Sequence, residues 1–72
     1  MRQADKLVRM ANDIARNLAP QGEATAAHAT ADHIRRFWDP RMGAGLLAYA
    51  AEDGSGLSPI ARAAVAEIAE PA

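Results

Sequence analysis

The sequence contains no cysteine, and its 72 residues include only one Phe, one Trp and one Tyr. Without cysteine the chain cannot form a disulfide, a thiolate zinc site or an iron–sulfur site of its own. No apolar run approaches the roughly 18 residues of a transmembrane helix, and the first residues lack the apolar core of a signal peptide. We therefore expect a cytoplasmic protein without a membrane segment.

Large apolar side chains are also scarce. Half of the residues are apolar, but 19 of those 36 are alanine. A domain of this size buries only about 60% of its unfolded surface, so its core supplies little net stability. We expect one helical domain over residues 1–72, with flexible ends at about 1–3 and 70–72. A protein partner is the expected source of additional stability.

The helical pattern is clearest near the N-terminus, where apolar residues recur three and four positions apart: Leu7, Met10, Ala11, Ile14, Ala15 and Leu18. Pro20 and Gly22 end this helix. A second helix is expected from about Glu23 to Trp38. Its face has small residues in the first half, which would let another helix or a partner approach closely; the face is formed by Ala27, Ala31, Ile34 and Trp38.

Two proline dipeptides mark the starts of the remaining helices. Asp39-Pro40 and Ser58-Pro59 each place a capping side chain before a proline that suits the first helical position. The helix after Pro40 ends at the Gly54-Ser55-Gly56 stretch. It contains Gly43 and Gly45, so it either frays or packs closely against another element. The pattern predicts an all-α protein, a small bundle of about four short helices.

One ten-residue segment, 33–42, is the candidate functional region. It holds the only Phe, the only Trp and three arginines, which are residue types enriched at the energetic centres of protein interfaces. We predict that it binds a partner through His33, Arg35, Arg36, Phe37, Trp38, Asp39, Pro40, Arg41 and Met42. A large ring at a helix junction can also serve the core, so Trp38 is open to both interpretations.

The residues give little sign of catalysis, metal binding or phosphate binding. His28 and His33 lie five positions apart, about 140° around a helix, so they cannot share a metal ion. His28 and Asp32 have suitable spacing but are only two ligands. We therefore expect no catalytic residue, no metal site and no cofactor in this chain.

An alternative function is that of a small helical nucleic-acid-binding or regulatory protein. Arg35, Arg36 and Arg41 could contact phosphates, but the net charge is −1 and the arginines could equally pair within the helix. The expected pairs are Asp32 with Arg36 and Arg35 with Asp39. This interpretation would require salt-dependent DNA binding, which the overall charge disfavours.

Two segments resemble a known family. The segment K-L-V-R-M-A-N-D-I-A at 6–15 and the block H-I-x-x-F-W-D-P-R-M at 33–42 are similar to the delta subunit of NAD-dependent, molybdenum-containing formate dehydrogenase. The second block is the more specific, because many amphipathic helices resemble the first. The similarity extends over about residues 6–65.

The resemblance implies a non-catalytic accessory subunit that binds the large catalytic subunit. In that family the other subunits carry bis-molybdopterin guanine dinucleotide, iron–sulfur clusters, FMN and the NAD site, and the delta subunit carries none. Its implied role is to support assembly, stability or retention of the molybdenum cofactor. No nucleic-acid or membrane partner is expected, and self-association of the isolated chain is left open.

Overall fold

The structure is a computed structural model that describes residues 3–70, and in that range the chain forms helices without any strand. The elements are α1 (Gln3–Leu18), a 3-10 turn η1 (Ala19–Gln21), α2 (Glu23–Phe37), α3 (Pro40–Glu52) and α4 (Pro59–Ala69). The prediction of a small all-α bundle of about four helices is confirmed. Of the expected flexible ends, residues 1–2 and 71–72 lie outside the described range, Gln3 begins α1, and Glu70 is the C-cap of α4.

The helix boundaries follow the proline and glycine signals of the sequence. The Asp39 carboxylate accepts a hydrogen bond of 2.8 Å from the Arg41 N–H, and Pro40 is the first residue of α3. At the start of α4, the Ser58 hydroxyl accepts a bond of 3.2 Å from the Ala61 N–H. Gly54 follows α3 with φ of 69°, a left-handed conformation that favours glycine. Local chemistry therefore sets where the helices begin and end.

One boundary differs from the expected one. α2 ends at Phe37, and Trp38 has extended backbone angles of −83° and 143°. Asp39, which precedes a proline, is also extended, because the proline ring disfavours the helical conformation of the residue before it. Two extended residues thus separate α2 from α3, and they turn the chain through a corner.

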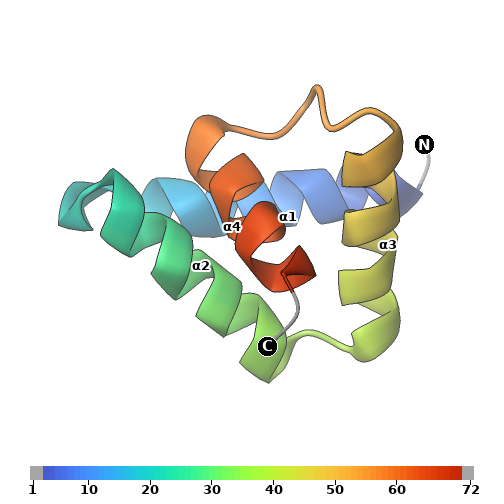
Figure 1. The fold of residues 1–72 in the computed structure, drawn as a ribbon, viewed down its shortest axis with the longest axis horizontal. Helices are drawn as coiled ribbons and strands as arrows, with labels where there is room; N and C mark the ends of the chain where they lie inside the picture. Colours follow the sequence, from blue (N-terminus) through green and yellow to red (C-terminus); the bar gives the residue numbers. More distant parts are fainter. Residues whose placement is uncertain (1–2, 71–72) are drawn as a thin grey trace.

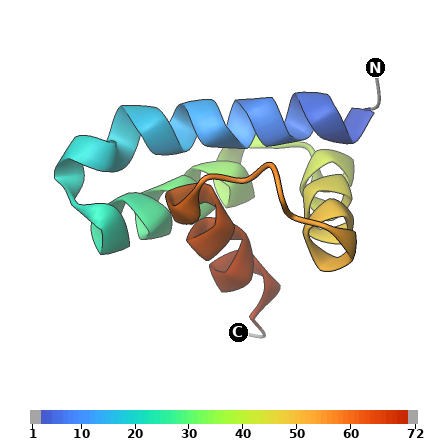
Figure 2. The same ribbon diagram turned by 90° about the horizontal axis from the view of Figure 1, so that it is seen from above.

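The helix α1 forms one side of the molecule, and the other three helices lie on its other side (Figure 2). It contacts all three of them, while α2 packs most extensively against α4. In Figure 1, α4 lies between α2 and α3 and points toward the viewer. α1 is therefore the common support on which the rest of the bundle is arranged.

The small-residue face of α2 is covered by other helices of the same chain. Ala26, Ala27 and Ala31 are buried, where α2 meets α1 and α4. The close approach predicted from this face is thus made by neighbouring helices, and the face is not available to a separate partner. Thr30 is buried among these alanines, and its hydroxyl donates a bond of 2.7 Å to the Ala26 carbonyl.

The hydrophobic core combines residues from all four helices and from the loop before α4: Leu7, Val8, Ala11, Ala15, Ile34, Leu46, Leu57, Ala61 and Val65. Val8 lies outside the predicted stripe of α1. It is buried because the 53–58 loop crosses α1 beside it, with Gly56 close to the Val8 side chain. α3 continues through both of its internal glycines, and Gly45 packs closely against Leu7. Close packing, not fraying, is therefore the outcome at Gly45.

Side chains from three helices hold the loop between α3 and α4. The Asn12 side-chain amide donates to the Gly56 carbonyl and accepts from the Ser58 N–H, each at 2.9 Å. The Tyr49 hydroxyl accepts from the Gly56 N–H, and the Arg62 guanidinium donates to the Gly54 carbonyl. These bonds fix the position from which α4 starts.

Candidate protein-docking site at the corner between α2 and α3

The corner between α2 and α3, residues 33–42, comprises the last turn of α2, the extended Trp38 and Asp39, and the first turn of α3. It contains every predicted partner-binding residue. The Asp39 cap and Pro40 fix the direction in which α3 leaves the corner. The predicted residues are thus brought together, but they occupy two different faces of the corner.

The two adjacent aromatic side chains lie in different environments. Phe37 is 72% exposed, and no other large hydrophobic residue in the described range is classed as exposed. Its ring packs against the imidazole of His33, one helical turn earlier, with centroids 4.9 Å apart at 47°. Trp38 instead is half-buried and packs against the hydrophobic core. Phe37 therefore projects from the outer face of the corner, whereas Trp38 stabilises its inner face.

The inner face of the corner is a depression of about 330 Å³. Trp38 and Pro40 line it, together with Leu47 of α3 and Ile68 of α4. Met42 is half-buried and packs against the core. Trp38 and Met42 thus serve the fold directly, while exposed residues such as Pro40 and Ala44 leave the depression open to another molecule.

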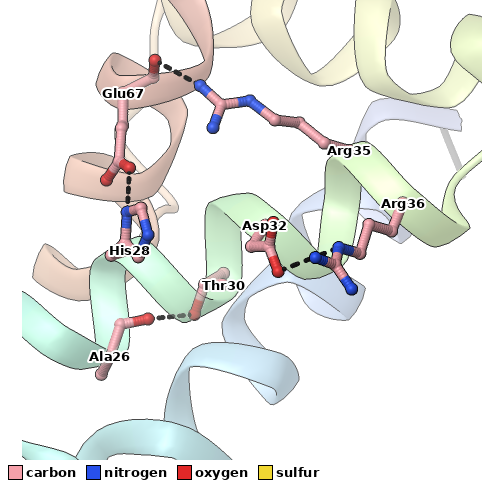
Figure 3. A network of polar contacts seen from close by, with 7 residues as sticks. All are labelled: Ala26, His28, Thr30, Asp32, Arg35, Arg36 and Glu67. Carbon is pink, nitrogen blue, oxygen red and sulfur yellow. Dashed lines mark hydrogen bonds and ion pairs between the residues drawn. The ribbon is translucent and has the colours of Figure 1, made fainter.

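The three arginines of the corner have three different neighbours. The Arg35 guanidinium donates a bond of 2.9 Å to the Glu67 carbonyl of α4, and Arg36 pairs with Asp32 at 3.2 Å (Figure 3). Arg41 lies beside α1, where it lines a small depression with Leu7. The expected pair of Asp32 and Arg36 is confirmed. The expected pair of Arg35 and Asp39 is wrong, because the Asp39 carboxylate caps α3 and Arg35 reaches α4 instead.

Glu67 connects α4 to α2 through two contacts that the sequence did not reveal. Its carboxylate contacts the His28 ring, and its carbonyl accepts the bond from Arg35 (Figure 3). His28 and Arg35 are 39 and 32 residues away in the chain, so no local spacing signals the contacts. His28 therefore bridges α2 and α4.

Residues 3–70 contain no group of three or more His, Asp or Glu side chains placed to hold a metal ion. None of their helices combines the length and the apolar character needed to cross a bilayer.

The family model of the NADH-dependent formate dehydrogenase delta subunit FdsD matches residues 6–65. This range includes both segments that carry the resemblance seen in the sequence, and it covers most of the chain. No curated protein and no solved structure matches.

Proposed function

We propose, since the chain belongs to the family of NADH-dependent formate dehydrogenase delta subunits, that it is a non-catalytic accessory subunit of this enzyme. A delta subunit is one component of a larger enzyme, so the chain associates with other subunits. The specific part of the proposal is that it binds the large catalytic subunit through the corner between α2 and α3. In the cytoplasm, the bound chain supports the assembly or stability of the enzyme, or the retention of its molybdenum cofactor.

The observation that carries the proposal is the exposure of Phe37. A largely exposed phenylalanine loses the free energy of burial that a core ring would gain, and in this chain it is the only phenylalanine. Aromatic rings in such positions are typical anchors of protein interfaces, where the partner supplies the missing burial. His33 supports the ring from one side, so the side chain is held in place before a partner arrives.

The absence of cysteine supports the non-catalytic part of the proposal, because the iron–sulfur clusters that such an enzyme requires need thiolate ligands from another subunit. The internal contacts of the arginines favour this function over nucleic-acid binding. Arg35 extends toward α4, Arg36 pairs with Asp32, and Arg41 lies against α1. They do not form one basic surface for a phosphate backbone.

The test is binding of the purified chain to the large subunit, measured by titration calorimetry and size-exclusion chromatography. The wild-type chain is expected to form a complex, and Phe37→Ala should weaken it by about 2 kcal/mol or more, roughly 30-fold. The matched control is Asn17→Ala, an exposed position of α1 remote in sequence from the corner, which should bind like the wild type. A wild-type chain that fails to bind the large subunit, or that binds DNA in a salt-dependent manner, would refute the proposal.

The second readout is the molybdenum content of the large subunit, expressed with and without the chain. We expect more molybdenum per large subunit with the wild-type chain than with Phe37→Ala. Equal contents in all three preparations would remove cofactor retention from the proposed role and leave assembly or stability to explain it.

A further inference from the structure

A groove runs along the whole inner side of α3. It consists of the depression at the corner, about 330 Å³, and a second one of about 290 Å³ between α3 and α4. Leu47 lines both, so the two depressions adjoin each other. On α3 the lining residues form a single helical stripe at i, i+3, i+4, i+7, i+10 and i+11: Pro40, Gly43, Ala44, Leu47, Ala50 and Ala51.

The opposite wall of the groove is also apolar and mostly small. It consists of Ile34 of α2, Trp38 of the corner, Leu57 of the loop, and Val65, Ala66, Ile68 and Ala69 of α4. Ala44 and Ala51 on one wall are exposed, and so are Ala66 and Ala69 on the other. Small side chains on two neighbouring helices allow the backbone of a third helix to approach closely. The shape of the groove therefore suits a helix, and the stripe from Pro40 to Ala51 is about 16 Å long, or three turns.

Three charged side chains line the groove. Arg35 and Asp39 lie in the depression at the corner, and Arg62 lies in the other depression. The Asp39 carboxylate is engaged as the cap of α3, where it accepts from the Arg41 N–H. Each guanidinium donates to a backbone carbonyl, Arg35 to Glu67 and Arg62 to Gly54. Neither has a carboxylate within 4.0 Å among residues 3–70. Both positive charges are therefore free to pair with acidic groups of another molecule.

We infer that this groove binds a helix of the large subunit whose packed face is apolar and which carries an acidic residue near each end, about three turns apart. The inference rests on the proposed function, because it assumes that the partner is the large subunit. It adds that the inner side of the corner binds a helix of that subunit. The apolar walls cover the middle of the bound helix, and Arg35 and Arg62 pair with its two acidic residues. Phe37, on the outer face, contacts a separate surface of the same subunit.

Zero-length cross-linking tests the charge pairs, and the chain suits this method because Lys6 is its only lysine. Arg35→Lys and Arg62→Lys each place an amine at one end of the groove, and Arg9→Lys, on the exposed face of α1, is the control. A carbodiimide should join positions 35 and 62 of the complexed chain to two acidic residues of one helical segment of the large subunit. Arg9→Lys should add no such product to those formed by Lys6.

Filling the groove tests its apolar part. Ala66 lines the groove, whereas Ala63 is another exposed alanine of α4 that lines neither depression. Ala66→Trp should weaken binding of the large subunit at least about tenfold, because the indole occupies the space of the partner helix. Ala63→Trp should bind like the wild type. Circular dichroism of both variants establishes that each remains folded.

The outcomes separate this inference from the proposed function. A complex that Phe37→Ala weakens but Ala66→Trp leaves unchanged would keep the proposed function and overturn the groove assignment. Cross-links from positions 35 and 62 to a second copy of this chain would also overturn it, because the occupant would then be another delta chain. Failure of the wild-type chain to bind the large subunit would remove both.

Discussion

Gly45 of α3 lies so close to Leu7 of α1 that a Cβ atom on the glycine would stand 3.0 Å from the Leu7 Cδ1 atom. A separation this short is below ordinary van der Waals contact, and Leu7 is buried and cannot swing away freely. The helices α1 and α3 thus approach each other at a point where an alanine requires the Leu7 side chain to shift by a few tenths of an ångström. Gly43, two residues earlier, has open space where its Cβ would be.

The two glycines should therefore respond differently to alanine. Gly43→Ala is expected to stabilise the domain by about 0.5–1 kcal/mol, because alanine is the better helix former. Gly45→Ala should lose that gain to the contact with Leu7 and be less stable than Gly43→Ala by about 1 kcal/mol or more. Urea denaturation of the three proteins measures both effects. Equal stabilisation by the two substitutions would mean that α1 and α3 are not in close contact.

Among the polar residues, Asn12 is expected to be the one whose replacement destabilises the fold most. Asn12→Ala removes the acceptor of the Ser58 N–H and the donor to the Gly56 carbonyl, which should cost about 1–3 kcal/mol. Asn17→Ala, on the same helix but exposed, should change the free energy of unfolding by less than about 0.5 kcal/mol. Thermal unfolding followed by circular dichroism compares them. Similar melting temperatures for the two variants would argue against a stabilising role of the bonds from Asn12 to Gly56 and Ser58.

The Asp39 cap gives a test of the corner itself. Asp39→Ala removes the acceptor of the Arg41 N–H and should cost about 1 kcal/mol of stability. Asp39→Asn retains an acceptor oxygen and should be close to the wild type. The measurement is the urea midpoint of each variant. If Asp39→Asn were as unstable as Asp39→Ala, the negative charge rather than the capping bond would be the stabilising feature.

Replacing Phe37 and replacing Trp38 should have different effects on the stability of the fold, even though the two residues are adjacent. Phe37→Ala exposes little that was buried and should change the free energy of unfolding by less than about 0.5 kcal/mol. A fully buried Trp→Ala change costs about 3–5 kcal/mol, so the half-buried Trp38 should cost roughly 2 kcal/mol. Melting curves of the isolated variants test this. A large loss of stability for Phe37→Ala would place its ring in the core and remove it as a docking anchor.

Local chemistry made most of the fold predictable from the sequence. The prolines at 40 and 59 with their capping neighbours, and the glycines at 22 and 54, determine helix ends through backbone preferences that need no tertiary information. The apolar spacing then identified most of the core. Val8 was missed because its cover comes from a loop almost 50 residues later in the chain, which periodicity within one helix cannot reveal.

The site was only partly predictable, for a related reason. The sequence identified the segment 33–42 but not which of its aromatic rings faces outward. That depends on α2 ending at Phe37, so that the extended Trp38 turns toward the core. The role of Arg35 likewise required the position of α4, since its acceptor is a backbone carbonyl that has no sequence signature. Tertiary contacts therefore determine both which ring faces outward and which group Arg35 contacts.

The bonds of Asn12 to Gly56 and Ser58 join residues that are 44 and 46 positions apart in the chain. During synthesis, a ribosome therefore releases α1 well before it releases the loop that α1 must hold. α4, which covers the alanine face of α2, emerges last of the four helices. Until then, α2 lacks the helix against which it packs most extensively. We expect stable structure only after α4 has left the ribosome, so the fold should form after synthesis rather than on the nascent chain.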